Sequence, residues 1–260
     1  MTNEPAPEPD ARAAPRGLSP QLDLVIPALN EETRIGATVR AICQQVAAEP
    51  WITRLIVVDN GSYDTTTEVV DLAHSAAVAV KIVSCRTRGK GAAVRTGMLH
   101  SRAPFVGYCD ADLSTPPSAM APGIDLLRSG WDVVIGSRRT AGVQYLEAQG
   151  LPRRLGSLAF HAVITRFTGS VSDTQCGFKL FRGDVGRMLF KESVINGFAF
   201  DVEILARARR RHLKMIELPI EWSDQQGSTF RPLADGIEAF RELRLLHAAL
   251  AQSAAAMDPP

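Results

Sequence analysis

The sequence has few of the side chains that build zinc clusters or disulfide frameworks. It contains four cysteines and five histidines, and no two cysteines form a CxxC pair. Disulfide-stapled domains and zinc modules use these residues densely and at fixed short spacings. A disulfide-rich or zinc-dependent fold is therefore not expected, and a reducing cytoplasm is the compartment that this composition favours.

Long apolar runs are also lacking. Nowhere do about 18 apolar residues follow one another, so the sequence predicts no transmembrane helix. Residues 1–20 contain five prolines and no apolar signal-peptide core, and residues 251–260 are similarly poor in large apolar side chains. Both ends are predicted to be disordered tails. The expected location is the cytoplasm, which also allows peripheral contact with the inner membrane face.

Neither sign of charge dominates. Lys and Arg number 29 against 28 for Asp and Glu, so nucleic acid is not expected as a partner. No GxGxxG follows the first apolar segment and no GxxxxGK[ST] occurs, which argues against a dinucleotide cofactor and a P-loop. Hydrophobic residues make up 45% of the chain, enough to bury a large core.

Short apolar runs alternate with helical periodicity over residues 21–231, which predicts one α/β domain with a mostly parallel sheet flanked by helices. Strands are expected at Leu22–Ile26, Leu55–Asp59, Val80–Val83, Phe105–Cys109, Val133–Ile135, Phe178–Phe181 and Met215–Trp222. Helices are expected at Glu32–Ala47, Thr65–Ala76, Gly91–Ser101, Pro117–Arg128, Arg153–Phe167 and Asp201–Arg211. A C-terminal amphipathic helix is expected at Pro232–Leu250.

Polar residues follow the first two predicted strands. Pro27 stops the first strand, Asn30 can cap the helix that follows, and Glu31 comes next. Asp59 ends the second strand, at the edge where ligands bind in open α/β sheets, so its carboxylate can accept hydrogen bonds from a nucleotide base or ribose. Helix capping is the alternative role for Asp59.

The segment Arg86–Arg95 combines glycines with basic side chains. Gly89 and Gly91 let a ligand approach the backbone closely, and a helix is expected to begin just beyond them. Lys90 adds positive charge between the two glycines. The segment therefore predicts a contact with an anion, and a solvated basic turn is the alternative.

The acidic triplet Asp110-Ala111-Asp112 ends the fourth predicted strand. Two carboxylates at positions i and i+2 after an apolar strand are costly near a core unless a cation compensates their charge. Mg²⁺ and Mn²⁺ prefer oxygen ligands, and either ion can neutralise a diphosphate leaving group. The triplet therefore predicts a divalent-cation site.

Seven segments in this order resemble glycosyltransferase family 2, whose members share the GT-A fold. The pattern is most similar to the dolichyl-phosphate β-glucosyltransferase and polyprenyl-phosphate mannosyltransferase types, and it covers nearly all of residues 22–230. The segments are the ends of the first two strands, Gly89–Gly97, Asp110-Ala111-Asp112, Val134–Arg138, Asp173–Lys179 and Gly197–Glu203.

The resemblance implies an inverting, metal-dependent hexosyltransferase that uses a nucleotide-diphosphate sugar. The residues that would bind the donor are Pro27, Asn30, Glu31, Asp59, Lys90, Asp110 and Ala111. Mg²⁺ or Mn²⁺ would bind at Asp110 and Asp112. The catalytic and acceptor side would contain Asp201, Asp173 and Arg138. The glucosyltransferase-like match of the Gly89–Gly97 segment favours a UDP-sugar over a GDP-sugar.

Two positions depart from the family pattern. Many relatives have a second Asp where this chain has Asn60, so a direct metal role there is not expected. Thr229 stands where a late loop of the family usually has Lys, so phosphate contact there would have to come from Arg231.

Two kinds of acceptor fit the sequence. A polyprenyl phosphate is already anionic and needs no strong base, and it would be held by Arg138, Arg153, Arg154 and Arg231. A small hydroxyl acceptor, such as a nucleoside or natural product, needs a carboxylate base. Asp201 is the first candidate for that base, with Asp173 and Glu203 as alternates. A non-catalytic module that binds a nucleotide sugar is a third hypothesis, against which the intact acidic triplet argues.

Overall fold

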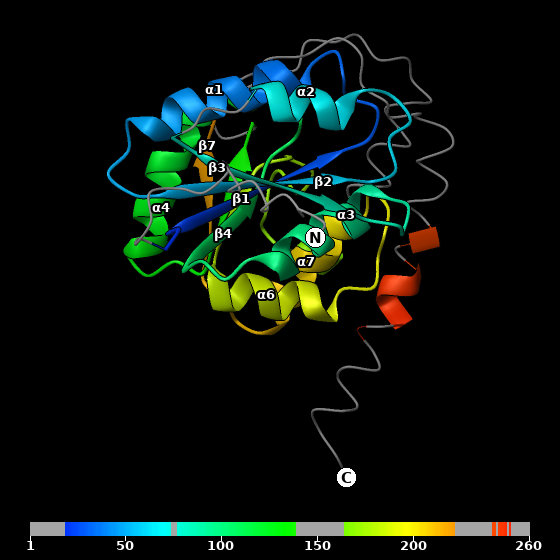
Figure 1. Ribbon diagram of the computed structural model, residues 1–260. Coiled ribbons are helices and arrows are strands. Elements are labelled where there is room, and N and C mark those ends of the chain that lie inside the picture. The colour runs from blue at the N-terminus through cyan, green and yellow to red at the C-terminus, as the bar shows by residue number, and fades with distance from the viewer. Residues whose placement is uncertain are drawn as a thin grey trace, which may run out of the picture.

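The computed structural model describes residues 19–73, 77–138, 164–221, 241–242, 244–248 and 250, in which strands and helices alternate (Figure 1). The strands are β1 Leu22–Ala28, β2 Thr53–Asp59, β3 Ala79–Ser84, β4 Phe105–Tyr108, β5 Val133–Ser137, β6 Lys179–Arg182 and β7 Met215–Pro219. The helices include α1 Ile35–Ala47, α2 Thr66–Ala73, α3 Lys90–His100, α4 Met120–Arg128, α6 Gly183–Glu192, α7 Phe200–Arg210 and the 3₁₀ turn η1 Pro117–Ala119. The described residues of 241–250 are also helical.

One seven-stranded sheet forms the centre of the domain, in the order β3-β2-β1-β4-β6-β5-β7. Neighbouring strands are parallel, except that β6 runs antiparallel to β4 and β5. The predicted α/β fold with a mostly parallel sheet is therefore confirmed. The register aligns Ala28 with Asp59 and Asp59 with Ser84, so these strands end together at one edge of the sheet.

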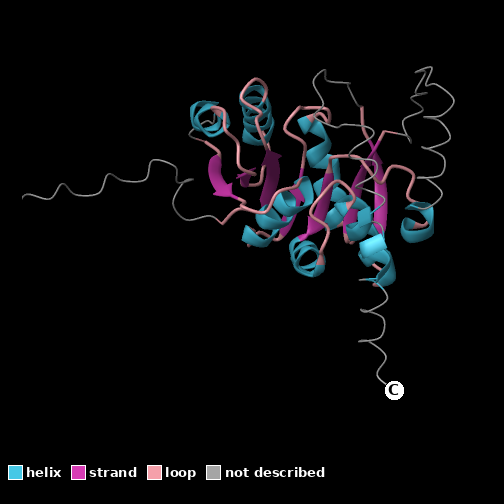
Figure 2. Cartoon of the chain, turned by 90° about the vertical axis from the view of Figure 1, so that its right-hand side faces the viewer, coloured by secondary structure: helices cyan, strands magenta, loops and turns pink. Residues whose placement is uncertain are grey.

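Helices cover both faces of the sheet, and each face has its own core. Helices α1, α2 and α4 lie on one side, and α3, α6 and α7 lie on the other (Figures 1 and 2). Within β1, Val25 packs with the α3 layer while Leu24 and Ile26 pack with the α1 layer. Burial on both faces explains why the central strands are almost continuously apolar.

Helix α6 is not among the elements that the sequence predicts. It contains Gly183 and Gly186, and a glycine weakens a helix by about 1 kcal/mol relative to alanine. Both glycines serve close packing here. A Cβ at position 183 would overlap the carbonyl oxygen of Ala103, and a Cβ at position 186 would crowd Val106. Packing on the sheet therefore overrides local helix propensity.

The first helix begins at Ile35 rather than at Glu32 as predicted. The backbone N–H groups of Arg34 and Ile35 both donate to the carbonyl of Glu31, which forms a separate turn before the helix. Asn30 does not cap this helix, because its side chain instead accepts a hydrogen bond from the Tyr63 N–H. The predicted capping role of Asn30 is wrong.

Several predicted features lie outside the described residues. They are Arg153, Arg154, Arg231, most of the helix expected at Arg153–Phe167, residues 232–240 of the expected C-terminal helix, and residues 1–18 and 251–260 of the predicted tails. Residues 164–168, which include the end of that helix, are helical. The last strand ends at Pro219, before the predicted end at Trp222.

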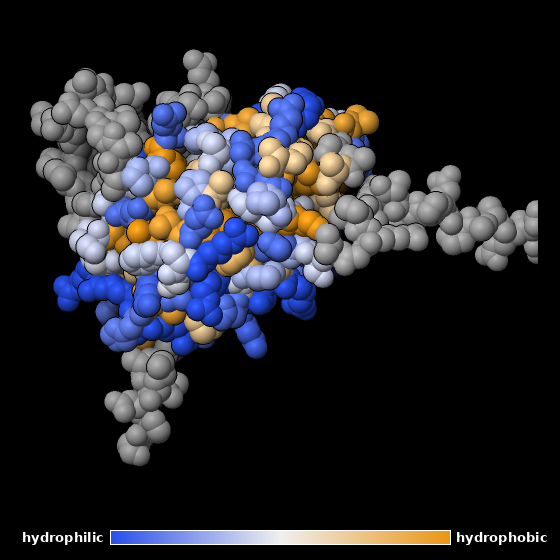
Figure 3. Space-filling view, turned by 90° about the vertical axis from the view of Figure 1, so that its left-hand side faces the viewer, coloured by the Kyte–Doolittle hydropathy of each residue, from blue (hydrophilic) through white to orange (hydrophobic). Residues whose placement is uncertain are grey.

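The described surface mixes polar and apolar side chains. On the side of the molecule that is at the left of Figure 1, hydrophilic residues surround small groups of hydrophobic ones (Figure 3). Among the helices that the structure describes, none combines the length and the apolar character needed to span a bilayer.

Candidate active site at the carboxyl edge of the sheet

The loops that follow β1 and β2 are bonded to each other at the carboxyl edge of the sheet. Asn30 has a left-handed backbone (φ 56°), which asparagine tolerates better than most residues. Its N–H donates to Ser62 Oγ at 3.0 Å, and its Oδ1 accepts from the Tyr63 N–H at 3.0 Å. The Glu31 N–H donates to Thr66 Oγ1 at 2.8 Å. The residues predicted to surround the base and ribose are thus brought to one place.

Asp59 is half-buried at the end of β2, and its carboxylate closes the turn that follows. Oδ1 accepts from the Ser62 N–H at 3.0 Å, and Oδ2 accepts from the Gly61 N–H at 3.3 Å. A carboxylate has lone pairs for further donors after accepting two hydrogen bonds. The turn-forming role and the predicted contact with a ligand are therefore compatible at Asp59.

Asn60 joins the β2 loop to the segment before α3. Its side-chain amide donates to the carbonyls of Cys85 at 3.1 Å and Thr87 at 2.7 Å, and its Oδ1 accepts from the Gly89 N–H at 2.9 Å. An aspartate could make only the last of these three bonds. The departure from the family pattern at Asn60 therefore has a structural role that the sequence did not reveal.

The two glycines around Lys90 allow close packing within the protein. A Cβ at position 89 would overlap the carbonyl oxygen of Asn196, and Gly89 has φ 120°, which favours glycine. A Cβ at position 91 would overlap Phe200. Residues 195–200 thus approach this backbone closely, and the contact of this segment with a ligand stays a prediction.

Lys90 forms an ion pair with the first aspartate of the acidic triplet. Its Nζ lies 2.5 Å from Asp110 Oδ1, and the two side chains are 22% and 27% exposed. Burial lowers the pKa of Lys90, but the carboxylates of Asp110 and Asp201 outweigh it, and the net pKa is raised. Lys90 is therefore a stable cation at the carboxyl edge.

Asp110 and Asp112 are held by close contacts with backbone. Any Cβ at position 177 would overlap the Asp110 carboxylate, so Gly177 lies directly against it. Asp112 Oδ1 accepts from the Ser114 N–H at 2.9 Å. The intervening Ala111 is buried, and its carbonyl accepts from Thr38 Oγ1 at 2.6 Å. Distant segments thus fix Asp110 and Ala111, and a local turn fixes Asp112.

The triplet offers ligands that fit a hard divalent cation. Asp110 and Asp112 supply only carboxylate oxygens, which suit Mg²⁺ or Mn²⁺ better than Zn²⁺. Burial raises the pKa of the Cys109 thiol, and the charges of these two residues raise it further. Within the described ranges no group of three or more His, Cys, Asp or Glu could hold a metal. Water and donor phosphate would have to complete the coordination.

Glu31 is engaged by a neighbouring arginine. Arg34 Nη2 donates to Glu31 Oε1 at 2.8 Å, and Arg34 Nε contacts the other carboxylate oxygen. The hydrogen bond to Glu31 is the largest influence on Arg34, and Asp112 and Asp110 add to it, so the pKa of Arg34 is raised. Arg34 is thus a stable cation whose charge is balanced by Glu31. Arg34 was not predicted as a site residue, although it stands three residues after Glu31 and directly before the first helix. Pro27 is half-buried within β1 and pairs with Val58, and the strand continues to Ala28, so the prediction that Pro27 stops the first strand is wrong.

Asp173 and Arg138 form a bidentate ion pair. Arg138 donates to the carboxylate from Nε at 2.6 Å and from Nη2 at 2.7 Å, and its backbone N–H donates at 3.0 Å. Burial raises the pKa of Asp173, but Arg138 outweighs this and the net pKa is lowered. Glu217 fixes the other side, since it accepts from the N–H groups of Ser172 and Asp173. The sequence did not identify Glu217.

Asp201 lies in a buried ionic cluster with Lys179 and Tyr108. Lys179 Nζ donates to Asp201 Oδ1 at 2.6 Å and to the carbonyls of Cys176 and Thr174 at 2.8 and 3.1 Å. The Tyr108 hydroxyl donates to the same carboxylate oxygen, and burial followed by the charge of Asp201 raises the pKa of Tyr108. The carboxylate predicted as a base is thus already paired with a buried cation.

Residues 23–189 match the model of the family described as Glycosyl transferase family 2. The chain belongs to this family. The dolichyl-phosphate beta-glucosyltransferase of Drosophila melanogaster is 32% identical over 245 residues, which cover 88% of this chain and 75% of the relative. That of Saccharomyces cerevisiae is 31% identical over 252 residues, which cover 88% and 74%. The resemblance found in the sequence is confirmed, and the chain is a glycosyltransferase.

Solved structures agree on the GT-A fold. Glucosyl-3-phosphoglycerate synthase from Mycobacterium tuberculosis, in complex with phosphoglyceric acid, has a TM-score of 0.66 at 18% identity and covers 87% of this chain and 80% of its own. The same synthase in complex with Mn²⁺, UDP-glucose and phosphoglyceric acid has a TM-score of 0.65, with 87% and 79% covered at 18% identity. Similarity at this level of identity establishes the fold.

Proposed function

We propose that the chain transfers a hexose, preferably glucose, from a UDP-sugar to a polyprenyl phosphate with inversion at the anomeric carbon. The curated relatives are named dolichyl-phosphate beta-glucosyltransferases, which supports both the sugar and the acceptor. The structural observation that favours a phosphate acceptor is the pairing of Asp201 and Asp173 with cations. A hydroxyl acceptor needs a base, whereas a phosphate oxygen is already anionic at the start of the reaction.

The nucleoside of the donor would bind where the loops after β1 and β2 meet. Pro27, Asn30 and Asp59 lie there, and the Asp59 carboxylate can accept a further hydrogen bond from a base or ribose. UDP is proposed over GDP because the similar synthase was solved with UDP-glucose and the curated relatives are glucosyltransferases. A competition measurement in which the protein binds GDP more tightly than UDP would reject this choice.

The diphosphate of the donor would lie between the acidic triplet and the start of α3. Asp110 and Asp112 would hold Mg²⁺ or Mn²⁺, which would neutralise the charge of the departing diphosphate. Lys90 is fixed at this place by Asp110 and would supply a further positive charge to a phosphate oxygen. Arg34 is balanced by Glu31, so Lys90 and the cation would carry most of the positive charge beside the diphosphate.

The acceptor phosphate would contact Arg138. Asp173 and Glu217 hold this arginine in a fixed orientation, which lowers the entropy lost when it binds an anion. Arg153, Arg154 and Arg231 remain predicted phosphate contacts in segments outside the described residues. A basic residue near an anionic membrane contributes about 1 kcal/mol, so these residues would give peripheral, reversible contact with the lipid surface.

The direct test offers radiolabelled UDP-glucose with Mg²⁺ or Mn²⁺ to three acceptors in parallel: dolichyl phosphate, uncharged dolichol, and a soluble nucleoside. Label is expected in the lipid fraction with dolichyl phosphate only, and NMR of the product should show a β linkage. Transfer to the nucleoside but not to the lipid phosphate would overturn the acceptor assignment. In that case Asp201→Asn should slow transfer far more than it weakens donor binding.

A further inference from the structure

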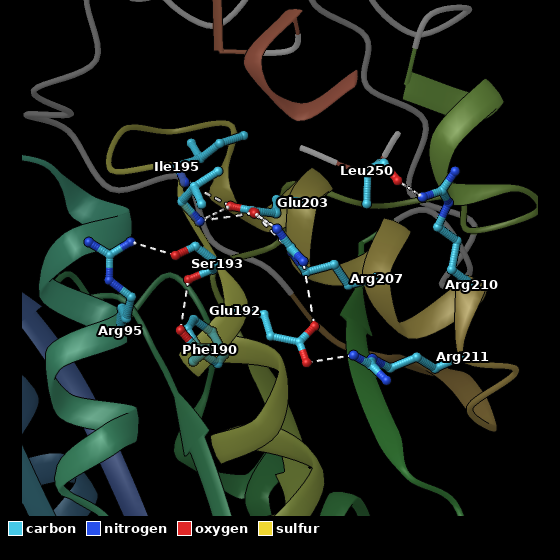
Figure 4. Close-up of polar contacts among 11 residues, drawn as sticks. Arg95, Phe190, Glu192, Ser193, Ile195, Glu203, Arg207, Arg210, Arg211 and Leu250 are labelled. Atoms are coloured by element: carbon cyan, nitrogen blue, oxygen red, sulfur yellow. Dashed lines mark hydrogen bonds and ion pairs between the residues drawn. The ribbon is translucent and has the colours of Figure 1, made fainter. Parts of the chain in front are cut away.

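The segment between α6 and α7 packs against the beginning of α3. Residues 193–199, called the brace loop below, bond to this helix at two places. The Asn196 carbonyl accepts from the Ala92 N–H at 3.1 Å. Arg95 donates from Nη1 to the Ser193 carbonyl at 3.1 Å (Figure 4). It also donates from Nη2 to Asn196 Oδ1 at 2.6 Å. The first turn of α3 is thus held from outside by a loop that is distant in sequence.

Two carboxylates from different helices hold the brace loop in turn. Glu203 of α7 is fully buried and accepts from the N–H groups of Val194 at 3.0 Å and Ile195 at 2.8 Å. Glu242, in the helical residues of 241–250, accepts from the N–H groups of Gly197 at 2.7 Å and Ala199 at 3.1 Å. Four backbone donors of one short loop are thereby satisfied by two side chains.

The charge on Glu203 is compensated within the protein. Arg207, which is 5% exposed, donates to Glu203 Oε1 from Nε at 2.9 Å and from Nη2 at 2.7 Å. Glu192 bridges from Arg207 to Arg211, with its closest contact at 2.5 Å (Figure 4). Buried carboxylates in such networks hold geometry, because breaking one contact exposes an uncompensated charge to apolar surroundings. This setting suits a structural anchor and does not suit the base that the sequence suggested for Glu203.

The brace loop acts at the place where Lys90 meets the acidic triplet. Gly89 and Gly91 flank Lys90 and let the loop approach, and Lys90 itself reaches Asp110 at 2.5 Å. A looser brace loop would free the first turn of α3 and let Lys90 move away from the triplet. The orientation of Lys90 therefore depends on contacts that begin at Glu203 and Glu242.

We propose that Glu203 and Glu242 are positioning residues of the donor site, which act through the brace loop to keep Lys90 aligned with the donor diphosphate. The inference rests on the proposed donor function and extends it to residues beyond the family match, which ends at residue 189. It also gives the C-terminal helical segment a part in donor binding, since Glu242 belongs to that segment.

The test compares Glu242→Ala and Glu242→Gln with the parent protein by calorimetry with UDP and Mn²⁺ and by steady-state kinetics. Loss of two charge-assisted hydrogen bonds should weaken UDP binding about tenfold in Glu242→Ala, with a matching rise in donor KM. The acceptor KM should change less than about twofold. Glu242→Gln keeps one acceptor oxygen and should restore part of the affinity.

Asp132→Ala is the matched control. Asp132 likewise accepts from a backbone N–H, that of Lys214 at 2.9 Å, but it precedes β5 at the opposite edge of the sheet. Its loss should lower stability and leave UDP affinity unchanged. Arg95→Met removes the bonds between α3 and the brace loop, so it should weaken UDP binding as Glu242→Ala does. It therefore tests the proposal even if Glu242→Ala folds poorly. UDP affinity equal to the parent's in both brace variants would overturn the proposal.

A second readout separates this inference from the proposed function. Hydrogen exchange at the Ala92 amide reports directly whether Asn196 still accepts its hydrogen bond. Its protection should fall in Glu242→Ala and stay unchanged in Asp132→Ala. If the parent binds no nucleotide at all, the proposed function fails, and the donor-site role of Glu242 fails with it. If the parent binds UDP and Ala92 protection is unchanged in Glu242→Ala, only the brace is rejected.

Discussion

Two lysine–aspartate pairs in this molecule have nearly the same geometry and opposite surroundings. Lys90 and Asp110 are 2.5 Å apart at the carboxyl edge, where their side chains are 22% and 27% exposed. Lys179 and Asp201 are 2.6 Å apart behind that edge, where their side chains are 0% and 4% exposed. Water can stabilise the first pair while its partners exchange, whereas opening the second leaves a charge in the core. The first pair is suited to binding a ligand, and the second to fixing structure.

The buried pair supports the exposed one through a single turn. Lys179 donates to the carbonyls of Thr174 and Cys176, and the next residue, Gly177, lies directly against the Asp110 carboxylate. The position of Asp110 thus depends on a cluster that is shielded from solvent. Substitutions in the two pairs should therefore separate stability from ligand binding.

The largest expected effect on stability is that of Lys179→Met. Removing the cation leaves Asp201 ionised and buried, which costs about 3–5 kcal/mol of unfolding free energy. Lys90→Met should cost less than about 1 kcal/mol, because its pair is partly solvated. Urea unfolding followed by circular dichroism measures both. Adding Asp201→Asn to Lys179→Met should recover part of the lost stability. If Lys179→Met and Lys90→Met lowered the unfolding free energy equally, the two pairs would not differ in the way described.

Asn60→Asp should have the next largest effect. The new carboxylate cannot donate to the carbonyls of Cys85 and Thr87, and it would face both oxygens within a buried site. A buried group left unsatisfied costs about 1–3 kcal/mol, so the unfolding free energy should fall by that amount. Asn60→Ser, which keeps one hydroxyl donor, is the milder comparison. An aspartate variant as stable as the parent would show that Asn60 does not anchor the segment before α3.

Asp59→Ala tests whether ligand binding depends on a second carboxylate at the carboxyl edge, where the Lys90–Asp110 pair also lies. Loss of one hydrogen bond to a ligand should weaken UDP binding by about 0.5–1.5 kcal/mol. Calorimetry with UDP gives the affinity, and thermal unfolding shows how much of the effect comes from the turn at Gly61 and Ser62. Asp64→Ala, in the same loop, controls for general loosening. Unchanged UDP affinity in Asp59→Ala would leave the residue with its turn-forming role alone.

The smallest expected effect is the pH dependence contributed by Asp173. Arg138 holds the folded-state pKa of this residue below its usual range despite burial. Such a group adds stability above its unfolded pKa, and this contribution is lost as the pH falls through the lower folded value. Asp173→Asn should therefore reduce the loss of unfolding free energy on acidification from neutral pH, measured by urea titration at several pH values. If the unfolding free energy fell equally steeply with acidification in the parent and the variant, the ion pair would not contribute to stability.

Much of the fold follows from local sequence. The apolar runs of β2 and β4, with Asp59 at the end of the first and Asp110 just after the second, predict parallel strands that end at a common ligand-binding edge. Helix α6 could not be predicted in this way, because Gly183 and Gly186 weaken a helix locally and are required only by contacts with Ala103 and Val106.

The partners of the site residues were harder to predict than the residues themselves. Asp201 and Asp173 stand in recognisable motifs, but their cations and supports come from other elements and depend on the folded structure. Lys179 offered one signal, a basic residue within the apolar run Phe178–Phe181, which indicates a buried partner. Glu217 and Glu242 offered none, since each acts on the backbone of a loop that only tertiary packing brings near.

The most direct test of the account is calorimetric titration of UDP-glucose into the parent and Asp112→Ala, with Mn²⁺ or with excess EDTA. Asp184→Ala, an exposed acid at the start of α6, serves as the control. The parent and control should bind and turn over donor only with the cation, and Asp112→Ala should do neither while its thermal unfolding stays close to the parent's. An Asp112→Ala protein that binds UDP-glucose with Mn²⁺ as tightly as the parent does, or a parent that binds it equally well in excess EDTA, would contradict the assignment of the acidic triplet as the metal-dependent donor site.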